Sequence, residues 1–179
     1  VVSVSNTLNR LGVDPVVSDD VEIILKADKV IFPGVGEAST AMEYLRARKL
    51  DKLIIGLKQP FLGICLGQQL MCAHSEENNT DCLGIFDLKV KFFKPELKVP
   101  HMGWNTIKLS NPSFLFKNVD LEHGFYFVHS YHVYCNNQAD NLAVANYCYD
   151  FTSVIQKQNM FGVQFHPESV LTPEGMNII

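Results

Sequence analysis

The sequence lacks a basic surface and a long apolar run. Its 15 basic and 19 acidic residues give a net charge of −4, and no stripe of Lys and Arg stands out. Nucleic-acid-binding proteins are usually basic, so no nucleic-acid partner is expected. No run approaches the ~18 apolar residues of a membrane-spanning helix, so no membrane association is expected. Because 47% of the residues are hydrophobic, the composition indicates a folded globular chain rather than a disordered one.

Cysteine is scarce, and its spacing excludes two common kinds of small scaffold. The number of cysteines is odd and no C-x-x-C pair occurs, which argues against a disulfide framework or a zinc knuckle. No secretory signal is visible. We therefore expect a cytoplasmic protein without a metal site. The five cysteines are Cys65, Cys72, Cys82, Cys135 and Cys148.

The first half of the chain alternates helical and strand patterns. Helices are expected at 1–11, 21–27, 38–49, 50–57 and from 66 to 72, and strands at 15–18, 29–32 and 60–64. The polar run 75–79 reads as an exposed loop. This alternation predicts an α/β domain with a doubly wound, mostly parallel sheet and helices on both faces.

The second half is rich in strand patterns and predicts added antiparallel hairpins. Strands are expected at 85–93, 104–109, 124–133, 142–149, 152–158 and 160–165, followed by a helix start at 173–179. We expect one domain over 1–179. A doubly wound domain should begin with a strand, so we also expect this first strand, and about a dozen N-terminal residues in all, to be missing. The last helix breaks off early, which indicates a second truncation.

A strand turns directly into a helix at Gly63-Ile-Cys-Leu-Gly67. Small residues two positions on either side of a nucleophile are typical of a nucleophile elbow, here with Cys65 in place of serine. At a helix N-terminus the unpaired N–H groups and the dipole favour thiolate over thiol. The alternative is that Cys65 is only a small core residue.

A second candidate element follows the last predicted strand. His166 could hold a proton for the thiol, and Glu168 could orient its imidazole, with Pro167 restricting the backbone between them. Taken alone, this His-Pro-Glu sequence could also be an ordinary turn.

The third element is Pro33-Gly-Val-Gly36, which also follows a strand and so lies at the same sheet edge. Its glycines allow positive φ and could point a peptide N–H at an oxyanion. The alternatives are a simple turn or a phosphate cradle, but the Lys-Ser/Thr pair of a P-loop is absent.

Together these elements resemble class I (triad-type) glutamine amidotransferases over most of the chain. Within that family the chain is most similar to the glutaminase subunits of imidazole glycerol phosphate synthase, through Val99-Pro-His-Met-Gly-Trp-Asn105 and Phe125-Tyr-Phe-Val-His-Ser-Tyr131. The resemblance implies a flavodoxin-like fold that hydrolyses L-glutamine to glutamate and ammonia without a cofactor. It also implies a (β/α)8-barrel synthase partner that uses the ammonia in histidine biosynthesis to make imidazole glycerol phosphate and an aminoimidazole carboxamide ribotide.

The resemblance further implies a role for each matched residue. Cys65, His166 and Glu168 match the catalytic triad, with Cys65 forming a glutamyl thioester. The other matches are the oxyanion-hole residues Gly34, Val35, Gly36 and Leu66, the substrate-binding residues Gly63, Gln69, His129, Ser130 and Tyr131, and the partner-facing residues Met102, Trp104 and Tyr126.

Other functions stay open at this point. Ser169 stands where the subunit usually carries Lys, and the tail 169–175 resembles the glutaminase component of anthranilate or aminodeoxychorismate synthase. A stand-alone γ-glutamyl cysteine hydrolase or a binding module that kept the fold are further alternatives. His129 and His132 are three apart in one predicted strand and should face opposite sides, which argues against joint metal binding.

Overall fold

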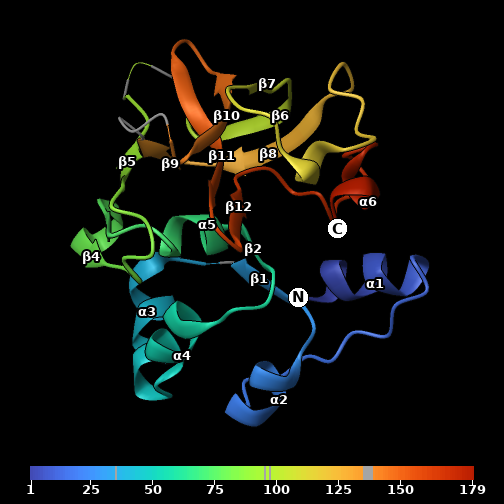
Figure 1. The fold of residues 1–179 in the computed structure, drawn as a ribbon. Coiled ribbons are helices and arrows are strands. Elements are labelled where there is room, and N and C mark those ends of the chain that lie inside the picture. Colours follow the sequence, from blue (N-terminus) through green and yellow to red (C-terminus); the bar gives the residue numbers. More distant parts are fainter. Residues whose placement is uncertain (35, 95, 97, 135–138) are drawn as a thin grey trace.

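Three of the expected strands form the parallel centre of the sheet in the computed structural model. The structure describes residues 1–34, 36–94, 96, 98–134 and 139–179. β1 (Val30–Gly34) pairs in parallel with β2 (Phe61–Cys65), and β12 (Met160–Val163) pairs in parallel with the other edge of β2. Strands from the two ends of the sequence therefore flank β2 (Figure 1).

The remaining strands extend this centre. From β12 the sheet continues through β11 (Asp150–Lys157), β9 (Tyr131–Tyr134), β5 (Lys89–Phe92), β3 (His74–Ser75) and β4 (Thr80–Asp81). β10 (Asn141–Asn146) pairs with β11 and with β7 (Lys108–Leu109), while β6 (His101–Asn105) and β8 (Phe125–His129) form a separate antiparallel pair. Within this extension β3 and β5 are parallel, and the other pairs are antiparallel.

The helices come mainly from the first half of the chain. They are α1 (Val2–Arg10), α2 (Val21–Lys26), α3 (Ala38–Ala47), α4 (Leu50–Gly56), α5 (Leu66–Leu70) and α6 (Gly175–Ile178), with short 3-10 turns η1 (Glu77–Asn79) and η2 (Phe114–Phe116). Asp20 is the N-cap of α2, because its carboxylate accepts hydrogen bonds from the backbone N–H groups of Glu22 and Ile23. No helix in the described ranges is long and apolar enough to cross a bilayer.

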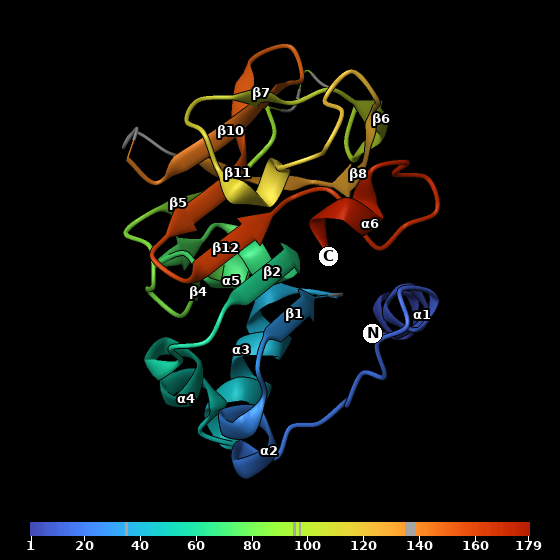
Figure 2. The same ribbon diagram turned by 45° about the vertical axis from the view of Figure 1, so that its right-hand side comes forward.

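The side chains of β2 point alternately into two cores, as a strand requires. Phe61 packs with the apolar faces of α3, α4 and α5, including Met42. Leu62 and Ile64 pack on the other side with β8 and β11 and with Ile178 of α6. Figure 2 shows α3 and α4 on one side of the central strands and β6 and β8 on the other. The α/β class with added antiparallel strands is thus confirmed.

The expected strand at 15–18 is wrong. A strand needs a neighbour to receive its backbone hydrogen bonds, and no described strand pairs with these residues. Val16 and Val17 are 75% and 66% exposed in the segment between α1 and α2. Their β-branched side chains suit a strand, but local preference does not supply a partner.

Two expected strands are each divided in two. Residues 124–133 form β8 and β9, which belong to different sheets and meet at Ser130, and residues 104–109 contribute to β6 and β7. The run 75–79 is not simply an exposed loop, because Ser75 is buried in β3 and η1 follows it. Apolar alternation predicts a strand but does not show where the chain changes its pairing partner.

We predict that Gly67→Ala destabilises the fold, because a methyl group at this position would clash with the carbonyl oxygen of Phe32 in β1. Overpacking of this kind costs about 1–3 kcal/mol, and each kcal/mol lowers the melting temperature by roughly 2–4 °C in a chain of this size. Thermal unfolding followed by circular dichroism measures the effect. Gly56→Ala is the matched control, since a methyl group there meets no atom within 4 Å. Equal melting temperatures for the two variants would contradict the prediction.

Candidate active site

Cys65 lies where β2 turns into α5 without an intervening loop. Its φ is 54°, a left-handed value that residues other than glycine adopt rarely. The strand-to-helix junction and the positive φ are the features of a nucleophile elbow, which presents its side chain at the carboxyl edge of the sheet. The elbow expected from the glycine spacing is therefore present in the backbone.

The Cys65 sulfur lies where three strands meet. The Nε2 atom of Gln164, just after β12, is 3.6 Å from Sγ, and the carbonyl oxygen of Val128, in β8, is 3.9 Å away. Gln164 is fully buried. The sulfur thus has a hydrogen-bond donor on one side and an acceptor on the other.

His166 and Glu168 form a buried pair just after β12. Nδ1–H of His166 donates to Oε1 of Glu168 at 3.0 Å, and the two side chains are only 18% and 10% exposed. The His166 backbone N–H donates to the Tyr126 carbonyl, which ties this segment to β8. Nε2 of His166 is buried and makes no hydrogen bond to any described group, so it can act on a bound molecule.

The charge on His166 is set by two opposing effects. Burial disfavours the imidazolium, but the nearby Cys65 sulfur and Glu168 carboxylate outweigh it and raise the pKa of His166 to about 10. By contrast, burial raises the pKa of the Cys82 thiol to about 11. Cys82 therefore remains a neutral thiol, whereas Cys65 has a cation beside it.

The expected oxyanion residues lie around the elbow. The register of β1 and β2 places Gly34 opposite Cys65, and Gly34 packs on the backbone of Leu66 and Gly67 so closely that a Cβ would clash. Gly36 is exposed, and its φ of +90° is a backbone conformation that requires glycine. Val35 lies outside the described residues.

The expected substrate residues fall into two groups. Ser130 and Tyr131 are partly buried at the change from β8 to β9, and Gln69 Nε2 donates to the Tyr131 carbonyl at 3.0 Å. His129 is buried, and its ring donates to the same carbonyl. Gly63 lies beneath α5, where a Cβ would clash with Met71 and with the α5 backbone, so its small size serves packing.

The carboxylate of Glu77 also belongs to this region, although no sequence pattern indicates it. Its Oε2 accepts the backbone N–H of Ala38 at 2.7 Å, at the start of α3 and two residues after Gly36. Burial of Tyr131 raises the pKa of that phenol, and the nearby charge of Glu77 adds to the increase. Glu77 therefore lies near both the residues that follow the predicted oxyanion loop and the predicted substrate residue Tyr131. A polar run between two-residue strands carries no periodic signal that could have revealed this.

The three residues expected to face a partner lie together on the outside. Met102 and Trp104 alternate along β6 and are each 62% exposed, and the Trp104 and Tyr126 rings stack edge to face with centroids 5.6 Å apart. Trp104 Nε1–H donates to the Leu171 carbonyl, and Val170 is 77% exposed. The result is an exposed apolar patch next to the His166–Glu168 segment.

A cavity of about 720 Å³ connects His166 and Glu168 with the surface. Tyr126, Val128, Ser169 and Val170 form one part of its wall, and α1 forms another. Thr7 of α1 donates to the Glu168 carbonyl at 2.8 Å, which fixes the helix against this cavity. The α1 residues that line it are Ser3, Asn6, Asn9 and Arg10.

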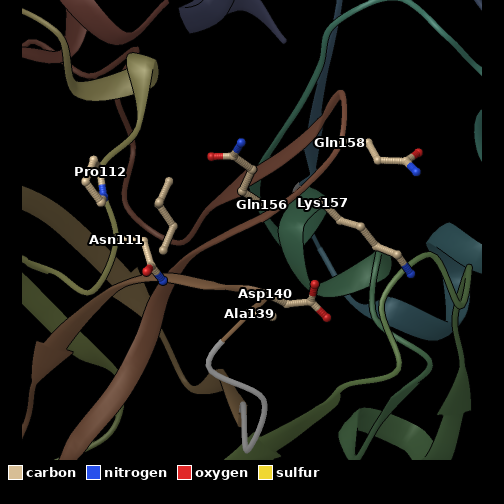
Figure 3. Close-up of a pocket in the computed structure, with 8 residues that line it drawn as sticks. Asn111, Pro112, Ala139, Asp140, Gln156, Lys157 and Gln158 are labelled. Atoms are coloured by element: carbon tan, nitrogen blue, oxygen red, sulfur yellow. The ribbon is translucent and has the colours of Figure 1, made fainter.

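A second hollow, of about 580 Å³, lies away from Cys65 (Figure 3). Gln158 lines it and lies two residues before Met160, the first residue of β12, which pairs with Phe61 at the start of β2. The hollow is therefore near the amino ends of the parallel strands. Reactions in such sheets take place at the carboxyl ends, which is where Cys65 lies.

The buried histidines do not form a metal centre. In the part of the chain that the structure describes, no group of three or more His, Cys, Asp or Glu residues is placed to hold a metal ion. The ring centroids of His129 and His132 lie 5.2 Å and 4.6 Å, respectively, from the centroid of the Phe93 ring. Both histidines thus contact the same side chain, and the expectation that they face opposite sides is wrong. The chain changes sheets at Ser130, which interrupts the alternation.

Comparison with known proteins agrees with this geometry. The family model described as "Glutamine amidotransferase class-I" matches residues 3–179. The chain belongs to the class I glutamine amidotransferase family. This confirms the family resemblance drawn from the three sequence elements.

Several relatives within the amidotransferase family carry one name, "Imidazole glycerol phosphate synthase subunit HisH". The protein from Bacteroides thetaiotaomicron is 54% identical over 170 residues, which is 93% of this chain and 85% of that protein. Those from Pectobacterium atrosepticum and Blochmanniella floridana are 48% and 45% identical over 169 and 168 residues, with the same coverage.

Solved amidotransferase structures share the fold at low sequence identity. One titled a glutamine amidotransferase superposes with a TM-score of 0.74 at 16% identity, covering 96% of this chain and 87% of that one. A glutamine amidotransferase from Thermotoga maritima gives 0.63 at 16% identity, covering 91% and 68%. At such identities the likeness supports the fold and no more.

We predict that removing the sulfur from this amidotransferase lowers the pKa of His166. In Cys65→Ala the burial that disfavours the imidazolium remains while one of the effects opposing it is lost, so the midpoint should fall from about 10 by roughly 1–3 units. NMR titration of the ring protons measures this, with the buried His132 as an internal control. Because the pKa is raised in the folded state, stabilisation by the charged ring is complete below pH ~6.5 and is lost as the pH rises through about 10. An unchanged His166 midpoint in the variant would mean that the sulfur does not influence the ring.

Proposed function

We propose that the chain is the glutaminase subunit of an imidazole glycerol phosphate synthase, with Cys65 as its nucleophile and His166 and Glu168 completing a triad. The proposal is supported by the Cys65 elbow and the buried His166–Glu168 pair, because the Cys65 sulfur is near enough to His166 to help raise the pKa of that imidazole. Identities of 45–54% to proteins named as HisH subunits favour this synthase over the anthranilate and aminodeoxychorismate alternatives.

The first step forms a thioester. The Cys65 thiolate attacks the side-chain carboxamide carbon of L-glutamine, and the negative charge moves to the carbonyl oxygen. Backbone N–H groups of Leu66 and the Gly34–Gly36 loop hold this oxyanion; removal of one such donor typically costs about 10²–10³ in rate. Glu77 and the 129–131 segment lie where they can hold the polar amino and carboxyl groups of glutamine.

The second step uses the proton on His166. Imidazolium Nε2–H gives its proton to the departing nitrogen, which leaves as ammonia, and the neutral ring then takes a proton from the water that attacks the thioester. Glu168 holds Nδ1–H throughout, so the same face of the ring serves both steps. The products are glutamate and a free Cys65, which restores the starting state.

Ammonia leaves through the cavity beside His166. Tyr126 and Val170 line the cavity, and the Tyr126 ring contacts Trp104, which belongs with Met102 to the exposed patch. An apolar patch at the exit of a reaction cavity fits a partner that receives the product without exposing it to water. We assign this patch to a (β/α)8-barrel synthase subunit.

The proposal also includes a cytoplasmic location and disfavours the alternative functions. An odd number of cysteines without a C-x-x-C pair supports a cytoplasmic location. The patch disfavours a stand-alone γ-glutamyl hydrolase, which needs no ammonia acceptor. A binding module would have no use for a strained cysteine beside a charged histidine.

We predict that Cys65→Ala abolishes glutamine hydrolysis by the complex with its synthase subunit, because no thioester can form. Ammonia-dependent synthesis by the complex should continue, since the synthase site is untouched. Coupled assays with glutamine or with ammonium salts separate the two activities. Cys82→Ala is the matched control and should retain glutaminase activity. Hydrolysis that persists in Cys65→Ala would exclude Cys65 as the nucleophile.

We predict that Trp104→Ala weakens binding to the synthase subunit by about tenfold or more, as expected for a central aromatic side chain of an interface. Titration calorimetry with the purified partner measures the dissociation constant. Ile55→Ala removes another exposed apolar side chain, from α4 and outside the patch, and should bind normally. The patch is not the interface if both variants bind as tightly as the unaltered chain.

A further inference from the structure

Gln164 has a place in the site that neither the triad nor the oxyanion loop accounts for. Its side chain is fully buried just after β12 and contacts the reacting sulfur, with Nε2 at 3.6 Å from Cys65 Sγ. Its Oε1 accepts from Gln69 Nε2 at 2.9 Å. The amide therefore has one end on a polar partner in α5 and the other on the nucleophile.

The neighbouring groups determine which end of the Gln164 amide, the oxygen or the NH2, faces the sulfur. A carbonyl oxygen can only accept, so the Gln69 group that contacts the Tyr131 carbonyl must be its NH2. The same NH2 group supplies the hydrogen bond to Gln164 Oε1. Gln164 must consequently turn its own NH2 toward the sulfur.

The Tyr131 carbonyl is itself held in place by a second donor. His129 Nδ1–H donates to it at 2.7 Å, so His129 Nε2 is left to accept from His101 Nδ1–H at 3.0 Å. His101 Nε2 in turn accepts from Asn105 Nδ2 at 3.3 Å. Burial lowers the pKa of His101 to about 4 and that of His129 to about 3, so both rings stay neutral and keep these directions.

We infer that Gln164 is a catalytic residue that donates a hydrogen bond to the Cys65 thiolate and is held in that orientation by Gln69. This inference rests on the proposed function, because it deepens the role of Cys65. A donor to an ionised group stabilises it more than a donor to a neutral one, and the effect is larger in a buried site. The neutral thiol has the Val128 carbonyl as acceptor, but a thiolate has no proton to offer it, so Gln164 joins the charged His166 as a favourable neighbour of the ionised sulfur.

Gln164→Glu is the sharpest test, carried out on the complex with the synthase subunit. The carboxylate can still accept from Gln69 but presents oxygen, in place of N–H, to the sulfur. Iodoacetamide alkylation of Cys65, followed by mass spectrometry across pH, reports thiolate formation. We expect the pH midpoint of alkylation to rise by about one unit or more, and kcat to fall about 10–100-fold while the KM for glutamine changes less than about threefold.

Two further variants complete the design. Gln164→Met removes the donor without adding charge and should shift the alkylation midpoint in the same direction by a smaller amount. If Gln164→Met does not fold, Gln164→Asn takes its place, because the shorter side chain withdraws the amide from the sulfur. Gln68→Met is the matched control, because Gln68 is also fully buried in the same region but donates to the Ser153 carbonyl. It should leave the alkylation midpoint unchanged even if it lowers the melting temperature.

The outcomes separate the inference from the proposed function. If the folded Gln164 variants alkylate and turn over like the unaltered complex, or if Gln68→Met shifts the midpoint equally, the inference is wrong while Cys65 stays the nucleophile. If Cys65→Ala retains glutaminase activity, the proposed function itself fails. A shift confined to the Gln164 variants, with KM preserved, supports the donor role.

Discussion

The site depends on the two parallel pairings of β2. Gly34 lies opposite Cys65 through the β1 pairing, and Val163 lies opposite Ile64 through the β12 pairing. Because parallel strands end at the same edge of a sheet, the glycine loop, the nucleophile and the His166 segment emerge together although about 130 positions separate the first from the last. A one-residue slip in either pairing would turn alternate side chains to the opposite face.

The chemistry of the site follows from placing charged and polar groups where water is largely excluded. His166 keeps its charge in a mostly buried setting only because a sulfur and a carboxylate neighbour it. His129 is more deeply buried, and this burial lowers the pKa of its ring so that it stays neutral. Histidine thus serves as a proton carrier at position 166 and as a neutral hydrogen-bonding group at position 129, and the surrounding groups determine which role each ring has.

The sequence was sufficient to predict the elbow, the strand-to-helix alternation and the residues that gather at the sheet edge, because glycine spacing and apolar runs reflect local backbone geometry. It was insufficient where tertiary pairing decides. The segment 15–18 has strand-forming valines but no described partner, and the change of sheet at Ser130 reverses the expected side of His132. Glu77 and Gln164 were overlooked because a lone polar residue shows its use only once its neighbours are known.

The aromatic cluster around Phe93 has a thermodynamic consequence. His101 and His129 bind protons near pH 6.5 in an unfolded chain but only near pH 4 and 3 when folded. Between these limits the unfolded state carries more protons, so linkage makes folding less favourable as the medium turns acidic. A core that orders the neighbourhood of the nucleophile at neutral pH therefore also sets an acid limit to the conditions under which the enzyme persists.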